Sequence, residues 1–236
     1  MSAFWKALFL VLSLSFSLGC PFSPPRVSLS RRLILGGGVA VGFAGGALEL
    51  YSRFPRLGVG AVDSLPFPKV PPRSVTIVFH GAGGQDDYTA ELMRRLGDSC
   101  AENEFVHIYD WSKYSSNFIK ASFNAQEIGG NLAGRIWDEY CGEPPAFVHA
   151  IGVSVGAFAA DSLCRQLKRL AGKKMEVQLT LLDPFTMRGI FGGGYGNRHF
   201  GKGADYFQQV RGMFAMRNVC YEECLSRSQK IIKLSS

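Results

Sequence analysis

An almost unbroken apolar run that leads directly into a Gly-x-Ser-x-Gly pattern constrains this chain more than any other feature. Residues 147–151 read Phe-Val-His-Ala-Ile, and Gly152, Ser154 and Gly156 follow at once. A serine on a sharp turn between a strand and a helix stands clear of the backbone, because flanking glycines remove the Cβ atoms that would collide there. The pattern therefore predicts a strand, a tight turn and a helix, with Ser154 as the candidate nucleophile.

The neighbouring sequence decides whether this pattern is meaningful, since a chain with 28 glycines meets it easily by chance. The run from Ala146 to Ile151 lacks alternation, which is typical of a central parallel strand covered on both faces. After the serine, apolar residues recur at helical spacing with basic residues between them, and Gly172 is a stop signal. These apolar positions are Ala157, Ala160, Leu163, Leu167 and Leu170. Both flanks favour a nucleophile elbow.

Strand-like and helix-like segments alternate from residue 74 to residue 182, which predicts an α/β fold with a doubly wound, mostly parallel sheet. The expected strands are Ser74–Phe79, Glu104–Asp110, Ala146–Ile151 and Val177–Leu182, and the expected helices are Tyr88–Cys100 and Ala121–Tyr140. Sites in such sheets lie at the carboxyl ends of the strands. His80, Ser154 and Asp183 all fall at such ends.

The net charge of +7 is concentrated at the start of the chain. Residues 1–73 carry +6, and the remaining 163 residues carry only +1. A nucleic-acid groove needs clustered Lys and Arg in the folded part, so we expect no nucleic-acid partner.

The N-terminal region is typical of a targeting segment. Lys6 precedes an apolar stretch, Ala7 to Gly19, with the length of a signal-peptide core. Ser30-Arg31-Arg32 then precedes a Gly-rich run to Leu48 and resembles a twin-arginine export signal. Two interpretations stay open: a bipartite address for export, or for a plastid or thylakoid, and one or two retained membrane anchors.

These features divide the chain into four parts. Residues 1–50 are the targeting or membrane segments, residues 51–73 a Pro-rich linker, residues 74–210 the core, and residues 211–236 a divergent tail. We therefore expect the protein to be membrane-associated or exported, with membrane contact through its N-terminal segments.

Four patches of the core resemble the α/β-hydrolases, and more narrowly the pancreatic-lipase group of serine lipases. They are His80-Gly81-Ala82; Tyr109-Asp110-Trp111 with Tyr114, Ala121, Asn124 and Ile128-Gly129; Val148 to Ser154; and Leu181-Leu182-Asp183-Pro184. The resemblance covers about residues 74–210. Inside the elbow, Val153 and Val155 replace the family's usual His and Leu, a departure that should alter the pocket wall more than the mechanism.

The resemblance implies a role for each site residue. Ser154 would attack an ester carbonyl after losing its proton to a histidine, and Asp183 would orient that histidine. The backbone amides of Val155 and Ala82 would form the oxyanion hole. The plainer alternatives are a structural Asp-Pro turn at Asp183 and an ordinary Gly-rich loop after His80.

The catalytic base is the missing element. The chain has four histidines, of which His80 belongs to the oxyanion turn and His107 and His149 lie within strands. The chain order of Ser, acid and His leaves only His199. In the family the histidine follows the strand that Ala204 to Phe207 resembles, where this chain enters its divergent tail. We therefore expect a sheet that is incomplete at the C-terminus, with the final strand and histidine missing or replaced; a truncated gene model, alternative splicing and a degenerate hydrolase all remain open.

The sequence thus predicts a serine hydrolase acting on carboxylic esters, of the lipase or esterase type, with an ester or lipid as substrate. The main alternative is a catalytically inactive hydrolase-like protein, and a further one is transacylation or thioester hydrolysis at the same serine. We expect no cofactor. We also expect no metal site, because Cys220-x-x-x-Cys224 has no second ligand pair nearby.

Overall fold

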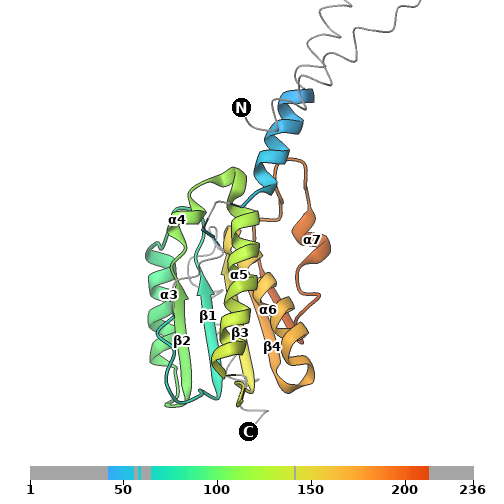
Figure 1. The fold of residues 1–236 in the computed structure, drawn as a ribbon. Coiled ribbons are helices and arrows are strands. Elements are labelled where there is room, and N and C mark those ends of the chain that lie inside the picture. Colours follow the sequence, from blue (N-terminus) through green and yellow to red (C-terminus); the bar gives the residue numbers. More distant parts are fainter. Residues whose placement is uncertain (1–41, 56–57, 60–64, 141, 213–236) are drawn as a thin grey trace, which may run out of the picture. The chain divides into compact units, whose positions relative to one another are not determined.

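A computed structural model of the chain describes residues 42–55, 58–59, 65–140 and 142–212. Its centre is a 5-stranded sheet in the order β2-β1-β3-β4-β5 (Figure 1). The strands are β1 (Ser74–Phe79), β2 (Glu104–Tyr109), β3 (Phe147–Val153), β4 (Glu176–Leu182) and β5 (Tyr206–Val210), and the helices are α3 (Asp87–Asp98), α4 (Ser112–Ser115), α5 (Phe118–Tyr140), α6 (Ala157–Ala171) and α7 (Tyr195–His199). Every pairing of neighbouring strands is parallel. The predicted doubly wound α/β fold is confirmed.

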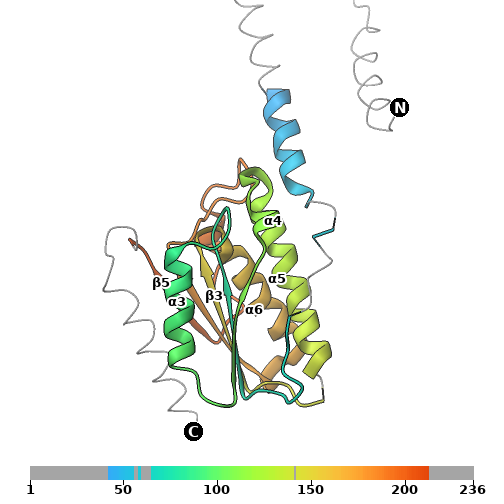
Figure 2. The same cartoon turned by 90° about the vertical axis from the view of Figure 1, so that its left-hand side faces the viewer.

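Helices cover both faces of this sheet. Helices α5 and α6 lie against one face and α3 against the other (Figure 2). The larger core lies under α5 and α6 and is built from Ile77, Phe79, Ile128, Leu132, Phe158, Leu163 and their neighbours. A smaller core under α3 joins Leu92 to Val78, Ile151, Val153 and Leu182. Because the central strand β3 is buried on both faces, it reads as a nearly continuous apolar run.

A glycine sets the close packing of α5 on α6. A Cβ at Gly129 would lie 2.0 Å from the carbonyl oxygen of Ala159, which no side chain can occupy. Only glycine therefore lets the two helix backbones approach this closely. This contact positions α6, which directly follows the short turn that carries the candidate nucleophile.

The predicted elements agree with the structure to within a few residues. The strand expected at Ser74–Phe79 is observed with the same bounds, and α5 begins at Phe118 rather than at Ala121. The segment Ala204 to Phe207, expected to resemble a further strand, overlaps β5, which starts at Tyr206, and the Asp205 amide just before it donates to the Val177 carbonyl of β4 at 2.8 Å. Leu170, expected on the buried face of α6, is 36% exposed near the end of that helix.

Residues from Gly46 onward belong to one compact unit. Residues 46–53 are helical, so the expected boundary at residue 50 falls inside a helix. Residues 65–73, the last part of the expected Pro-rich linker, have no helix or strand apart from local bends. They nevertheless pack on the domain, since Leu65 is buried and the Tyr140 hydroxyl donates to the Pro68 carbonyl at 3.0 Å. Most of the expected targeting segment and nearly all of the divergent tail lie outside the described residues.

Candidate active site

Strand register brings the polar residues singled out in the sequence to one edge of the sheet. Phe79 pairs with Tyr109 and with Gly152, and Val153 pairs with Leu182. The residues that follow these strand ends are His80, Asp110, Ser154 and Asp183. They gather around β1 and β3, where the strand order reverses, which is where sites form in doubly wound sheets.

Ser154 lies on a strained turn of the kind predicted. Its φ is +51°, a left-handed conformation that few residues other than glycine adopt. A Cβ at Gly152 would lie 2.6 Å from the Cα of Ala157, and a Cβ at Gly156 would lie 2.5 Å from the carbonyl oxygen of Phe79. Both elbow positions therefore require glycine, and the Ser154 side chain stands at the start of α6, partly exposed.

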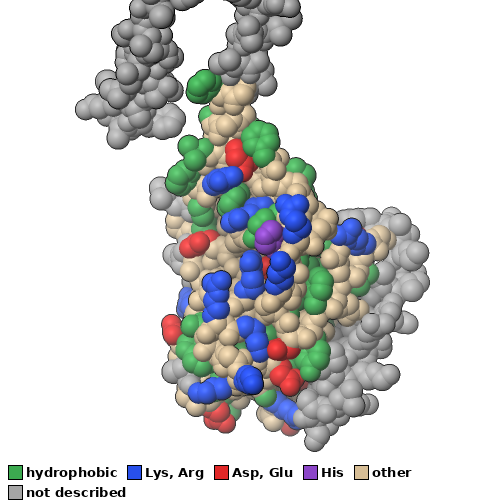
Figure 3. All heavy atoms as spheres, turned by 90° about the vertical axis from the view of Figure 1, so that its right-hand side faces the viewer, with side chains coloured by type: hydrophobic (Ala, Val, Ile, Leu, Met, Phe, Trp, Pro, Cys, Tyr) green, Lys and Arg blue, Asp and Glu red, His purple; other side chains and the backbone are tan. Residues whose placement is uncertain are grey.

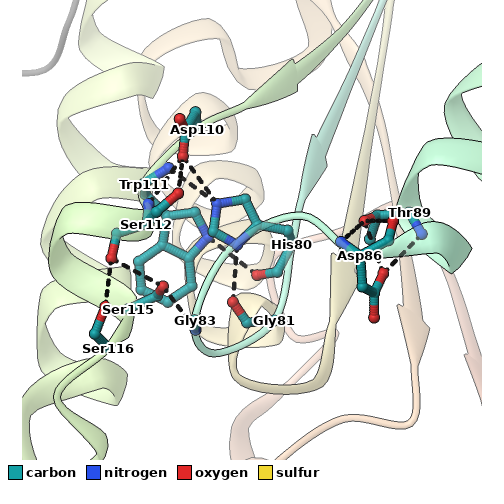
Figure 4. Close-up of polar contacts among 10 residues, drawn as sticks. All are labelled: His80, Gly81, Gly83, Asp86, Thr89, Asp110, Trp111, Ser112, Ser115 and Ser116. Atoms are coloured by element: carbon teal, nitrogen blue, oxygen red, sulfur yellow. Dashed lines mark hydrogen bonds and ion pairs between the residues drawn. The ribbon is translucent and has the colours of Figure 1, made fainter.

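The turn after β1 is held beside Ser154 by an interlock between His80 and Trp111 (Figure 4). The indole Nε1–H of Trp111 donates to the His80 carbonyl at 3.0 Å, and the Trp111 amide donates to His80 Nε2 at 3.1 Å. The two rings stack with centroids 5.5 Å apart, and both side chains are buried. A Cβ added at Gly81 would lie only 3.4 Å from the Ser154 Cβ, so the turn passes directly over the serine.

This interlock assigns His80 a structural role. His80 Nδ1 lies 2.8 Å from the Gly81 carbonyl, to which only a protonated nitrogen can donate. Nε2 lies 3.1 Å from the Trp111 amide and 3.3 Å from Asp110 Oδ1, so this nitrogen is also engaged. Both ring nitrogens are engaged and the side chain is 0% exposed, which leaves His80 unable to take a proton from Ser154.

A serine cluster on α4 supports the outer part of the same turn. The Gly83 amide donates to the buried Ser115 hydroxyl at 3.1 Å, and Gly83 has a φ of +86°. Asp110 accepts from the hydroxyl and the amide of Ser112, and these hydrogen bonds hold the pKa of Asp110 below its ordinary value. Asp110 is therefore an anion that anchors α4, and sequence reasoning had not given it this role.

Two backbone amides are positioned as candidate oxyanion donors. Val155 is the second residue of the turn Ser154–Gly156 that opens α6, so its amide has no acceptor one helical turn earlier. The amide of Ala82, in the turn after β1, donates no hydrogen bond to any of the described residues. Helix N-termini favour negative charge, which suits an oxyanion at this point.

Asp183 follows β4 beside the serine, but its carboxylate contacts the backbone of the segment after β5. The Phe185 amide donates to the Ser154 carbonyl at 3.0 Å, which ties the Asp183 turn to the elbow. Asp183 has a φ of +44°, and its Oδ1 accepts the Gly212 amide at 2.6 Å. Sequence reasoning missed the Gly212 contact, because only the pairing of β5 with β4 shows that residue 212 returns to this edge.

No described histidine is joined to the Ser154 hydroxyl by a hydrogen bond. His199 ends α7, where its Nδ1 lies 2.8 Å from the Tyr195 carbonyl and its ring stacks on Tyr195 with centroids 4.0 Å apart. His149 lies in the middle of β3 with Nε2 2.8 Å from the Thr180 hydroxyl, and burial lowers its pKa to about 4. His107 lies within β2, stacked on Phe105.

Within the described part of the chain, no group of three or more His, Cys, Asp or Glu residues is arranged to hold a metal ion. The same part of the chain contains no helix long and apolar enough to cross a membrane.

No family model matches this chain, and a search of curated proteins found no matching relative. The class of protein therefore follows from the fold itself: a doubly wound α/β domain, whose parallel sheet is consistent with that of an α/β-hydrolase.

Proposed function

We propose that this chain carries a serine hydrolase site for carboxylic esters, lipid esters among them. One observation carries the proposal: Ser154 has a φ of +51° and lies between two glycines at which any Cβ would overlap backbone atoms. Strain of this kind costs on the order of 1–3 kcal/mol and gathers at functional sites. It presents the serine hydroxyl at the edge of the sheet, beside two amides suited to an oxyanion.

The proposed chemistry is acyl transfer to the serine. The Ser154 oxygen loses its proton and attacks the ester carbonyl, and the amides of Val155 and Ala82 stabilise the negative charge that develops on the carbonyl oxygen. The bond to the alcohol then breaks, the alcohol leaves with a proton, and water hydrolyses the acyl-serine to release the acid and restore the hydroxyl. One such donor is commonly worth about 10²–10³ in rate. The interlock of His80 with Trp111 supports this role, because it keeps the turn that carries Ala82 from moving away as the charge forms.

In this proposal the rate is limited because no described histidine is placed to act as the general base. Both ring nitrogens of His80 and Nε2 of His149 are engaged in buried contacts, and Nδ1 of His199 contacts the Tyr195 carbonyl within its own helix. Removal of the base from a Ser triad leaves about 10³–10⁴-fold catalysis from binding and the oxyanion hole. We therefore expect this chain to hydrolyse esters slowly. The alternative, a hydrolase-like protein that binds an acyl compound without turnover, rests on the same placement of the histidines.

Chemical rescue tests the proposal. The purified chain is assayed with p-nitrophenyl butyrate at neutral pH over a series of imidazole concentrations, with Ser154→Ala and Ser116→Ala in parallel. Ser116 is an exposed serine whose hydroxyl bonds to the Ser112 carbonyl, so its loss should leave the site intact. We expect imidazole to accelerate the wild type and Ser116→Ala beyond the background that Ser154→Ala shows, because imidazole can act as the missing base.

Each outcome separates the two candidates. An imidazole-dependent rate that depends on Ser154 supports the hydrolase site. Equal rates in wild type and Ser154→Ala at every imidazole concentration would refute Ser154 as a nucleophile and favour the non-catalytic protein.

A further inference from the structure

A basic hollow lies between α5, α6 and the segment that follows β4, and none of its residues belongs to the candidate active site. It has a volume of about 250 Å³. Arg165 and Arg169 reach it from α6, Gln126 from α5, and Arg188 and Tyr195 from the segment between β4 and β5. We call it the basic pocket.

The charge of this pocket is uncompensated. None of the described residues that line it is acidic. Arg165 is paired with Asp161 at 2.8 Å, but no ion pair of Arg169 or Arg188 occurs within the described residues. Figure 3 shows Lys and Arg side chains gathered on the face of the molecule that includes α7, with acidic side chains mostly toward its edges. The pocket therefore carries about two positive charges that the described protein does not neutralise.

Arg188 is held in place by two aromatic rings and by no acidic partner among the described residues. Its guanidinium lies over the Phe123 ring at 4.6 Å and over the Tyr195 ring at 4.8 Å. Its Nε is buried and has no hydrogen-bond partner. Two aromatic contacts hold the guanidinium plane but leave the in-plane N–H donors unused, and those donors are what Arg uses to bind oxyanions.

The segment that carries Arg188 is rigidly built. The Ile190 amide donates to the Glu49 carboxylate at 2.8 Å, and the Gly189 amide donates to the Ser122 hydroxyl at 3.2 Å. Gly189 has a φ of +67°, and a Cβ there would lie 2.8 Å from the Ser52 hydroxyl oxygen. The site is thus preorganised, which reduces the ordering entropy that binding must overcome.

A second hollow beside Arg188 is a poorer match for an anion. It has a volume of about 310 Å³ and is lined by Glu49 as well as by Arg53. Burial by itself would raise the pKa of Glu49, but the amides of Phe191 and Ile190 and the Arg53 guanidinium lower it below its ordinary value. Glu49 is therefore charged at neutral pH and repels anions, so an anion should prefer the side of Arg188 that faces Arg169.

We propose that the basic pocket binds a phosphate group, supplied either as inorganic phosphate or as a phosphomonoester headgroup such as that of phosphatidic acid. Guanidinium groups that approach from α6 and from the segment after β4 match an anion with several oxygens and two charges better than they match a single carboxylate. The Tyr195 hydroxyl, which accepts from Gln126 at 3.4 Å, is free to donate a further hydrogen bond to the anion.

Isothermal titration calorimetry of the full chain tests the proposal. Inorganic phosphate and short-chain phosphatidic acid below its micellar concentration are titrated in separate experiments, with ionic strength held constant by sodium chloride because salt screens charge. The variants are Arg169→Gln, Arg188→Gln and, as the matched control, Lys174→Gln, which removes one exposed charge outside the pocket. Thermal unfolding of each variant checks that it folds.

We expect Kd for phosphate to rise at least about tenfold in Arg169→Gln and Arg188→Gln, and to change less than about twofold in Lys174→Gln. Arg169 is exposed, so its substitution should not disturb folding even if Arg188→Gln does. If the affinities for the two ligands differ by less than about tenfold, free phosphate is a sufficient ligand. If phosphatidic acid binds more tightly by a larger factor, the ligand is the lipid headgroup. Either result supports phosphate binding in the basic pocket. Absence of binding by both ligands, or equal weakening in Arg169→Gln and Lys174→Gln, would overturn it.

Discussion

Replacement of Gly156 by alanine should damage the elbow more than its small change in volume suggests. The new Cβ would lie 2.5 Å from the carbonyl oxygen of Phe79 and 2.6 Å from that of His80. Both are backbone atoms at the end of β1, so no side-chain rotation can relieve the overlap. Either the start of α6 moves away from β1, or the turn after β1 shifts over Ser154.

The expected magnitude follows from this geometry. Overpacking of a well-packed site costs about 1–3 kcal/mol, and contact with backbone on two sides places Gly156→Ala at the upper end, near 3 kcal/mol. For a domain of this size, 1 kcal/mol corresponds to a change in Tm of about 2–4 °C. We therefore expect the Tm of Gly156→Ala to fall by about 6–12 °C.

Thermal unfolding followed by circular dichroism measures this change, and Gly134→Ala is the matched control. A Cβ at Gly134 meets nothing within 4 Å, and this position lies inside α5. Alanine stabilises a helix interior by about 0.8–1 kcal/mol relative to glycine, so this variant should melt a few degrees higher than the wild type. If the Tm of Gly156→Ala equals that of the wild type, β1 does not approach the elbow as closely as described, and the turn after β1 is not placed over Ser154 as proposed.

Four further predictions concern the acid, the histidines and the N-terminus. Asp183→Asn should retain the fold, because an amide oxygen can still accept the Gly212 amide, and should change the slow ester hydrolysis less than about twofold; a loss of about 10⁴ would instead reveal a histidine that the carboxylate orients. His199→Ala should leave p-nitrophenyl butyrate turnover unchanged. High wild-type activity that is lost in this variant would instead identify His199 as the base. Burial lowers the pKa of His149 to about 4 from 6.5, so the unfolded chain binds more protons between these values and stability falls as pH drops through this window. We therefore expect the free energy of unfolding, measured with urea, to fall between pH 7 and pH 4.5 by about 2–3 kcal/mol less in His149→Gln than in the wild type. Equal falls in the two proteins would contradict the buried, neutral state of His149. Residues 1–50 fused to a reporter should direct it to a membrane or organelle, whereas a reporter that stays cytosolic would disprove the targeting segment.

Much of the fold was predictable because its signals are local. A β-branched run marked β1 and an apolar run marked β3, since a strand buried on both faces has few polar residues. Helical periodicity marked α5 and α6 in the same way. The helix over residues 46–53 was not predicted, because its buried polar residue Glu49 is satisfied by the amides of Ile190 and Phe191, far along the chain.

The candidate site was predictable only in part. The Gly-x-Ser-x-Gly pattern located Ser154 and its turn, because the two glycines that the tight turn requires can be recognised at their fixed spacing in the sequence. The interlock of His80 with Trp111 depends on strand register, which places residue 110 beside residue 80. The contacts of Arg188 with the Phe123 and Tyr195 rings depend on how the segment after β4 packs against α5, and no local pattern encodes that.

The two central residues of the site differ in what their conformations imply. Asp183 has its carboxylate bound to the Gly212 amide, so a hydrogen-bonded acid at this position is stable whether or not an imidazole is present. Its presence alone therefore does not argue for a working triad. Ser154 differs, because a glycine would adopt a φ of +51° without strain. The fold requires a left-handed residue there but gains nothing from the hydroxyl, which forms no hydrogen bond among the described residues. No described contact uses the hydroxyl that the strained turn presents, which is why the proposal for this protein rests on Ser154 rather than on Asp183.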